Sequence, residues 1–252
     1  MKPFLILQLR PLDAACENEL QAILKYGGIK DNEYRQIRME RKGIPDLDLN
    51  DYSGIIIGGG PGNVSDPEEK KGTAQKRYEI DLQKLYNKVF ELDFPLLGTC
   101  YGVGSIADYL GCSVSREKYS ESPGAVNIIL TKEAQNDPIT KGLPKEFRAF
   151  TGHKESCQRL PKGAVLLASS KACPYQMFRF KKNIYTIQFH PELDFEGLVV
   201  RIGIYKHEGY FKPEDAQRLI DVNRYEKIVV PEMILRRFVK MYLSQLKTVQ
   251  PK

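Results

Sequence analysis

A cysteine between two glycines, at the junction of an apolar run and a helical pattern, most constrains how this chain folds. The apolar run covers residues 94–97, and Cys100 follows it with Gly98 and Gly102 two residues to either side. The helical pattern then continues toward Gly111, a residue well placed to end a helix. This stretch predicts a buried strand, a sharp turn and a helix, with Cys100 at the turn and its side chain above the end of the strand.

Such a turn suits a nucleophile. The backbone is strained there, and small neighbours are needed because the chain is crowded. The N-terminus of the following helix adds positive potential beside the sulfur, so we expect the thiolate form of Cys100 to be favoured. A buried cysteine near glycines is also common as a plain core residue, and the rest of the chain has to decide between the two interpretations.

Length and composition fit one large domain that needs no disulfide or structural metal to be stable. The chain has 252 residues, a net charge of +6 and 42% hydrophobic residues, enough for a full core. Lys and Arg are interleaved with Asp and Glu, which argues against nucleic-acid binding, and no apolar run is long enough for a signal peptide or membrane span. Five cysteines without a Cys-x-x-Cys motif argue against a disulfide framework or a metal site, and they indicate a reducing, cytoplasmic setting.

Apolar runs and helical patterns alternate through the first part of the chain. Strands are expected at residues 4–9, 34–39 and 54–57, and helices at residues 13–27 and 74–92. Together with the strand and helix around the cysteine, this alternation predicts an α/β fold with a mostly parallel sheet.

The pattern changes after Gly111. Short strand-like runs separated by turn signals predict a β-rich addition to the sheet. These runs are residues 126–130, 164–168, 175–180 and 184–189. Helical patterns return at residues 192–209, 213–222 and 231–246. We find no linker or repeat, so we expect residues 1–195 to form the domain and residues 196–252 to form a helical extension packed on it.

A cluster of glycines follows the strand at residues 54–57. Gly58, Gly59 and Gly60 stand at its carboxyl end, where open α/β sheets place their ligands. Their backbone N–H groups are able to point at an anion or a developing oxyanion. The cluster lacks the Gly-Lys-Ser/Thr ending of a phosphate loop and the spaced glycines of a dinucleotide site, so a plain turn is the main alternative.

The last strand-like run ends in a histidine, a proline and a glutamate. His190 lies at the strand end, so we expect it at the same edge of the sheet as Cys100. Glu192 is near enough in sequence to bond the imidazole and fix its tautomer. Only His153 and His207 compete with His190 as a base. The sequence therefore predicts a nucleophile, a base and an orienting carboxylate.

In combination these motifs resemble the class I glutamine amidotransferases of the triad type. Residues 98–102 with residues 190–192 resemble the family's elbow and its His-Pro-Glu, and the glycine cluster resembles its oxyanion loop. Residues 137–170 resemble the glutaminase part of GMP synthase in its free-standing form. The resemblance covers residues 1–195 and implies a three-layer α/β/α, flavodoxin-like fold.

The resemblance also implies a reaction. Cys100 would attack the side-chain amide of glutamine and form a γ-glutamyl thioester, His190 would protonate the departing ammonia and activate water, and Glu192 would hold the ring. The N–H groups of Gly59 or Gly60 and of Tyr101 would bind the oxyanion. No metal or organic cofactor is implied. The ammonia would pass to a synthetase partner.

One position departs from the family pattern. The elbow usually carries a glutamine four residues after the cysteine, whereas this chain has Gly104, which removes hydrogen bonds to the substrate and should leave space. The substrate is then glutamine or a larger γ-glutamyl compound. His153 is expected either beside the substrate pocket or as a loop histidine bonded to backbone.

Three alternatives to a glutamine amidotransferase stay open. One is a stand-alone γ-glutamyl hydrolase that uses the same triad on a γ-glutamyl amine or peptide. Another is a catalytically silent binding subunit of the same fold. The third is the chaperone-like branch of similar folds, which also has an elbow cysteine but which the His-Pro-Glu strand end does not fit.

Overall fold

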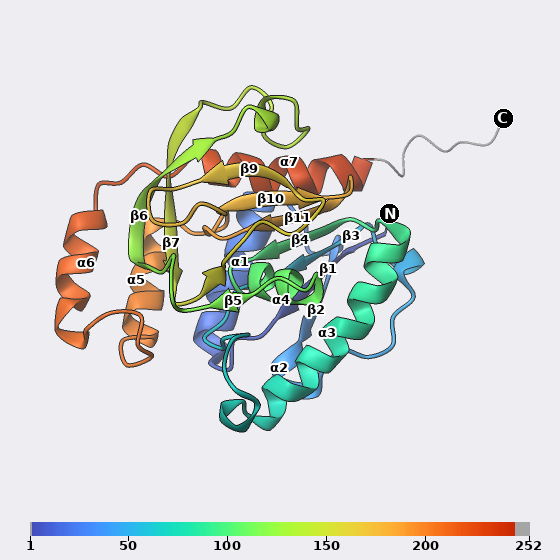
Figure 1. Cartoon of the computed structure of the whole chain (residues 1–252), viewed down its shortest axis with the longest axis horizontal. Coiled ribbons are helices and arrows are strands. Elements are labelled where there is room, and N and C mark those ends of the chain that lie inside the picture. Colours follow the sequence, from blue (N-terminus) through green and yellow to red (C-terminus); the bar gives the residue numbers. More distant parts are fainter. Residues whose placement is uncertain (1, 245–252) are drawn as a thin grey trace.

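The computed structural model describes residues 2–244 and places nine strands in one twisted sheet (Figure 1). The strands are β1 (Phe4–Gln8), β2 (Tyr34–Arg38), β3 (Gly54–Ile57), β4 (Leu96–Thr99), β6 (Glu121–Leu130), β7 (Glu146–His153), β9 (Val165–Ser169), β10 (Met177–Phe180) and β11 (Ile184–Ile187). Two short strands, β5 (Val114–Ser115) and β8 (Ser156–Cys157), pair beside it.

The order of the strands is β2-β1-β3-β4-β11-β10-β9-β6-β7. From β2 to β11 all neighbours are parallel, and from β11 to β7 all neighbours are antiparallel. The sheet thus joins a parallel α/β core to the β-rich addition through β11, whose one edge pairs with β4 and whose other edge pairs with β10. Because parallel strands point the same way, the carboxyl ends of β1, β3, β4 and β11 meet at one edge.

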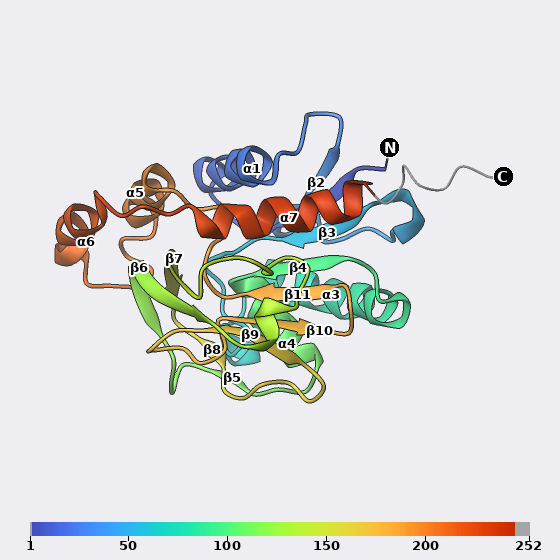
Figure 2. The ribbon, with the colours of Figure 1, turned by 90° about the horizontal axis from the view of Figure 1, so that it is seen from above.

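Helices cover both faces of the parallel part. The helices within residues 2–244 are α1 (Asp13–Gly27), α2 (Met39–Lys42), α3 (Thr73–Leu92), α4 (Tyr101–Tyr109), α5 (Phe195–Ile204), α6 (Ala216–Asn223) and α7 (Val230–Ser244). Side chains of β1 alternate between the two faces: Phe4 and Ile6 pack with α1 and α7, whereas Leu5 and Leu7 pack with α3. The result is a three-layer α/β/α arrangement with a mostly parallel central sheet (Figure 2).

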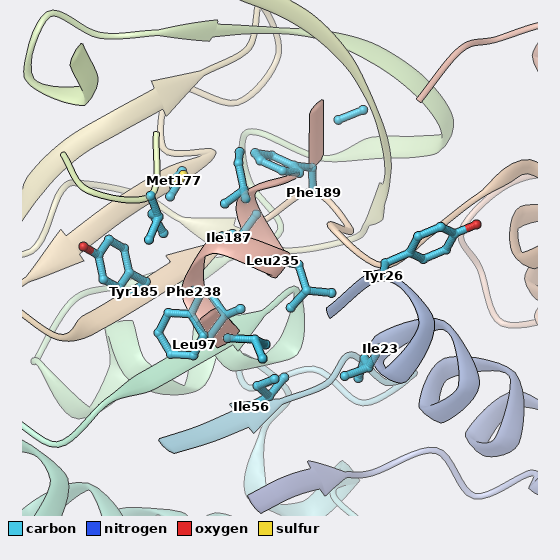
Figure 3. Close-up of a cluster of buried hydrophobic side chains, with 14 of the residues drawn as sticks. Ile23, Tyr26, Ile56, Leu97, Met177, Tyr185, Ile187, Phe189, Leu235 and Phe238 are labelled. Atoms are coloured by element: carbon cyan, nitrogen blue, oxygen red, sulfur yellow. The ribbon is translucent and has the colours of Figure 1, made fainter. Parts of the chain in front are cut away.

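The last helix contributes to the main core. Phe238 on α7 is fully buried and packs against the rings of Phe4 and Tyr185, with centroids 6.0 Å apart in both pairs. Leu235 on α7 joins Leu97 and other strand residues in the same cluster (Figure 3). Burying each such side chain stabilises the fold by about 1.5–3 kcal/mol, so α7 is a substantial part of what covers this face of the sheet.

Two of these helices, α5 and α6, cover the antiparallel part. Leu198 and Ile202 of α5 and Leu219 of α6 pack with Phe150 of β7 in a separate cluster. Figure 1 shows α5 and α6 together beside β6 and β7. Residues 205–211, which we call the 205–211 segment, follow α5 and lie beside the end of β1, where Arg10 donates to the Tyr205 hydroxyl.

Most predicted elements are confirmed, with two corrections. The β7 strand was not predicted, because Arg148, Thr151 and Gly152 interrupt its apolar run. The helix predicted at residues 192–209 is only α5, because the Asp194 side chain accepts from Gly197 N at 2.8 Å and caps the helix there. Residues 245–246 of the last predicted helix lie outside the described residues. None of the helices within residues 2–244 has the length and apolar character needed to cross a bilayer.

Candidate functional site

The elbow after β4 has the strained turn that its sequence predicts. Cys100 adopts φ 49° and ψ −96°, a conformation that is costly for a residue with a side chain. Its N–H donates to the carbonyl of Ile187 at 2.9 Å, which ties the turn to the end of β11. A side-chain carbon added to Gly98 would lie 2.7 Å from Ile106 Cδ1, so only glycine fits there. The turn is therefore fixed from both sides with Cys100 at its apex.

His190 lies at the other strand end and is bonded to Glu192. Its Nδ1 is 2.9 Å from Glu192 Oε1, and its backbone N–H donates to the carbonyl of Phe150 at 2.9 Å. Both side chains are almost fully buried. The ring is thus held by a carboxylate in front of one nitrogen, which leaves Nε2 as the nitrogen available to a reacting group.

Cys100 and His190 approach each other across the glycine loop. A side-chain carbon placed on Gly59 would lie 3.3 Å from Cys100 Cβ and 3.1 Å from His190 Cε1. The two side chains also line one cavity. The structure therefore brings together the three residues Cys100, His190 and Glu192 that the sequence singled out.

Arg201 joins this group, although no pattern in the sequence pointed to it. Its Nη2 donates to Glu192 Oε1 at 2.8 Å, and its Nη1 is 3.0 Å from His190 Nδ1. The guanidinium is buried, and its Nε has no hydrogen-bond partner among the described residues. Glu192 thus contacts both the ring and the cation, which also contact each other, and one of its oxygens, Oε2, is unpartnered within residues 2–244.

Burial governs the ionisation of the site. It raises the pKa of Cys100 to about 12, against the opposing attraction of the Arg10 cation. It also lowers the pKa of His190, although Glu192 acts in the opposite direction. Attraction by His190 and Arg201 overcomes burial at Glu192 and holds the pKa of that carboxyl well below its usual range.

The expected thiolate at Cys100 is therefore corrected. The N-terminus of α4 lies beside the sulfur, but burial raises the pKa of the Cys100 thiol. Burial thus favours a neutral thiol and a neutral imidazole at this site.

A buried ion pair holds the glycine loop at residues 58–60. Glu19 on α1 is fully buried and accepts from Arg10 Nε at 2.8 Å and from the N–H of Gly59 at 3.1 Å. The N–H of Gly58 donates to the carbonyl of Leu7 and completes the sheet ladder. These two donors are already used, which corrects the expectation that Gly59 offers its N–H to an oxyanion.

Two backbone N–H groups near the sulfur are available as hydrogen-bond donors. Within the described part of the chain, the N–H groups of Gly60 and Tyr101 form no hydrogen bond, and both residues line the space beside Cys100. Tyr101 begins α4, so its N–H lacks an intrahelical partner. The arrangement provides an anion-binding pair at the elbow.

A polar cavity lies on one side of Cys100. It is lined by Gly60, Gly62, Asn63, Cys100, Tyr101, Gly104, His153, Lys154, Glu155, Gln188 and Tyr210. The space expected at Gly104 is not empty: an added Cβ would meet Glu155 Oε1 at 3.3 Å and Val64 Cγ2 at 3.4 Å. That carboxylate accepts from the N–H groups of Val64 and Ser65 at 2.7 and 2.9 Å. Glu155 thus occupies the room left by the missing side chain.

His153 ends β7 rather than lying in a loop. Its Nε2 is 2.9 Å from Glu121 Oε2, and its Nδ1 is 3.0 Å from the carbonyl of Glu155. Both ring nitrogens face protein oxygens, so the ring shapes the wall of the polar cavity and has no nitrogen left for a bound molecule.

A second cavity lies on the His190 side of the sulfur. Its walls are Arg10, Gly60, Cys100, Pro123, Thr151, Gly152, His190, Leu193, Leu198, Arg201, Ile202, Tyr205, Tyr210 and Phe211. Tyr210 lies between the two cavities and donates from its hydroxyl to the carbonyl of Gly60 at 3.3 Å. The 205–211 segment is also held by Arg10, which donates to the Tyr205 hydroxyl at 3.0 Å. Within residues 2–244 no cluster of three or more histidine, cysteine or acidic side chains is arranged to hold a metal ion.

Comparison with known proteins decides the family. The model of the family "Glutamine amidotransferase class-I" matches residues 18–196 of this chain. The chain belongs to the class I glutamine amidotransferases. Glutamine-hydrolyzing GMP synthase from Thermosipho africanus is 33% identical over 140 residues, which are 55% of this amidotransferase and 24% of that protein. This amidotransferase thus spans about a quarter of the length of such whole GMP synthases.

A shorter relative and two solved structures complete the comparison. A subunit of the glutamine-hydrolyzing GMP synthase from Pyrococcus abyssi is 31% identical over 166 residues, 63% of this chain and 79% of that protein. A glutamine amidotransferase from Thermotoga maritima has a TM-score of 0.75 at 23% identity and covers 96% of this chain and 99% of its own. Another from Methylobacillus flagellatus has a TM-score of 0.72 at 21% identity, with 100% and 97% covered. The two structures share the fold of this amidotransferase.

Proposed function

We propose that this amidotransferase hydrolyses the side-chain amide of glutamine with Cys100 as nucleophile. The single observation that supports this most is the meeting of Cys100 and the His190–Glu192 pair at one cavity beside the glycine loop. A nucleophile, a base and free backbone donors are together the elements that acyl transfer needs.

The proposed reaction has two steps. The sulfur of Cys100 attacks the amide carbon while its proton moves to His190 Nε2, and the N–H groups of Gly60 and Tyr101 bind the oxyanion. The carbon–nitrogen bond then breaks, and ammonia leaves with the proton from His190. A water molecule that gives a proton back to His190 attacks the γ-glutamyl thioester, and glutamate and the Cys100 thiol are released.

Each residue has a separate task in this scheme. Since Cys100 is a thiol at rest, His190 has to act as a base before attack, and its lowered pKa keeps it neutral and able to do so. Glu192 fixes the Nδ1–H tautomer and stabilises the imidazolium while it exists. Loss of one oxyanion donor typically costs about 2.7–4 kcal/mol of transition-state stabilisation.

The ammonia is proposed to serve a synthetase partner. The Pyrococcus abyssi relative is named as one subunit of a glutamine-hydrolyzing GMP synthase, and the whole GMP synthases extend well beyond the part that matches this amidotransferase. A separate polypeptide that consumes ammonia would supply the missing half of such a reaction.

The test is labelling and turnover in the same preparation. Glutamate release from glutamine is measured, and the protein is treated with an electrophilic glutamine analogue and digested for mass spectrometry. We expect modification of Cys100, loss of turnover in Cys100→Ala and normal behaviour of Cys112→Ala, which changes a buried cysteine that is not in the wall of either cavity. Turnover that survives Cys100→Ala would refute the proposal, and unlabelled, inactive wild-type protein would favour a silent binding subunit.

A further inference from the structure

The two cavities beside Cys100 differ in chemistry. The position of His190 indicates which of them receives the leaving group. His190 lines the second cavity and is absent from the walls of the polar one. The group that departs from the amide carbon takes its proton from this ring, so it has to lie on the His190 side of the sulfur. The polar cavity, with Asn63, Lys154 and Glu155 in its walls, is then left for the amino-acid end of the substrate.

The leaving-group side is mostly apolar. Pro123, Leu193, Leu198, Ile202 and Phe211 form much of its wall. Its volume is about 40 Å³, more than the single position that a water-sized molecule needs. Ammonia needs only one such position and gains nothing from aliphatic walls, whereas an alkyl group on the leaving nitrogen would be removed from water there.

The charges around this cavity are already matched. Arg10 is paired with Glu19 at 2.8 Å, and Arg201 is paired with Glu192 at 2.8 Å. A carboxylate on the leaving group would lose its water in a mostly apolar cavity, and the Nε of Arg201 is the buried guanidinium donor that is left without a partner among the described residues to offset that loss. An ammonium would face both guanidinium groups. A neutral substituent avoids both costs.

One wall residue offers a partner for the leaving nitrogen itself. Thr151 lines the cavity, and its hydroxyl is buried and has no hydrogen-bond partner among the described residues. A buried hydroxyl without a partner is unfavourable. An amine N–H in the cavity would donate to it.

We propose that the same site hydrolyses γ-glutamyl amides whose leaving amine carries a small, neutral, apolar group. The inference rests on the proposed cysteine mechanism and adds the class of leaving group. The atoms balance as for glutamine: Cys100 Sγ bonds to the γ carbon, the carbon–nitrogen bond breaks, the amine leaves with the proton from His190, and water releases glutamate.

The experiment compares four substrates of the full chain. They are glutamine, γ-glutamyl isobutylamide, γ-glutamylvaline, which differs from the isobutylamide by one carboxylate, and γ-glutamyl 3-aminopropylamide, which carries an ammonium. We expect kcat/KM for the isobutylamide to exceed that for glutamine by about tenfold or more, and the two charged substrates to fall below the isobutylamide by at least that factor.

Variants of one helix link the preference to the cavity. Ile202→Phe places a larger ring in the cavity, and we expect it to lower the ratio of isobutylamide to glutamine turnover about tenfold. Val200→Phe adds the same ring to an exposed position of α5 and serves as the control. Should Ile202→Phe fold poorly, Phe211→Ala enlarges the cavity and is expected to shift the preference toward longer alkyl amides.

The outcomes separate the two proposals. Glutamine turnover by Cys100 with no gain for the isobutylamide would overturn the inference and leave the proposed function intact, as expected for a cavity that only lets ammonia out. A preference for γ-glutamylvaline would overturn the neutral leaving group. Inactivity toward all four substrates, with Cys100 unlabelled, would overturn both.

Discussion

Glu192 and Arg201 form a buried ion pair beside the His190 ring. Neutralising one member should therefore lower stability and activity more than neutralising both. In Glu192→Gln the Arg201 cation stays 3.0 Å from Nδ1 with no anion beside it. Removing one partner of a buried pair costs about 3–5 kcal/mol of unfolding free energy. In a domain of this size that corresponds to a fall in Tm of roughly 6–20 °C.

Activity should fall for the same electrostatic reason. An imidazolium facing an unopposed cation 3.0 Å away is destabilised by up to about 5.5 kcal/mol at an effective dielectric constant of 20, and the orienting carboxylate is lost as well. We expect kcat/KM of Glu192→Gln to drop on the order of 10⁴. Adding Arg201→Met removes the cation, so kcat/KM of the double variant should be at least tenfold higher than that of Glu192→Gln. Its free energy of unfolding should be about 2–3 kcal/mol higher than the sum of the two single changes predicts.

The assays are urea unfolding and glutamate release for the four members of this cycle. Because the folded-state pKa of Glu192 is lowered, its contribution is fully present above the ordinary carboxyl pKa and is lost as the pH falls through the lowered value. The cost of Glu192→Gln should therefore shrink in strong acid. The partly exposed pair Arg148–Glu226 is the control, and Glu226→Gln should cost less than about 1 kcal/mol. A double variant no better than Glu192→Gln would refute the idea that the Arg201 charge acts on His190.

Three more predictions concern the glycine loop, the Cys100 thiol and the His190 ring. Gly59→Ala puts a carbon 3.0–3.3 Å from the side chains around the sulfur and should lower kcat more than about 100-fold, whereas Gly72→Ala, with no atom within 4 Å, should stay near wild type in both kcat and stability. Because burial raises the pKa of Cys100 to about 12, its alkylation by iodoacetamide, corrected with Cys100→Ala, should keep rising with pH to about pH 10, and a plateau near neutral pH would show a thiolate instead. Because the pKa of His190 is lowered from the model-compound value of 6.5, the acidic limb of kcat/KM should lie below that pH, and a limb above it would contradict the assignment of His190 as the base.

Local patterns in the sequence were enough to predict much of this site. The glycines around Cys100 predicted the elbow because close packing at a strand-to-helix turn excludes other residues, and a side-chain carbon on Gly98 would lie only 2.7 Å from Ile106. His190 was placed at the same edge because parallel strands end together. These inferences need only short-range pattern and the direction of strands.

The residues that sequence reasoning missed act through long-range contacts. Glu19 and Arg10 are polar residues next to apolar patterns, and nothing in their spacing shows that they meet under the glycine loop. Arg201 lies within an apolar helix, and its role depends on where α5 crosses His190. The pKa of Cys100 was misjudged for a similar reason: the dipole of α4 is visible in the sequence, whereas the desolvation that opposes it depends on the packed structure.

The site divides along the chain in a way that bears on its chemistry. The matched family region ends at residue 196 and contains the elbow, the glycine loop and the His-Pro-Glu turn. Several walls of the leaving-group side come after it, on α5 and the 205–211 segment, among them Ile202, Tyr205 and Phe211. In the proposed reaction the shared part breaks the carbon–nitrogen bond, whereas the part that follows would set which amine fits beside His190. We therefore expect changes in α5 and the 205–211 segment to alter the choice of leaving group while the cysteine chemistry stays the same.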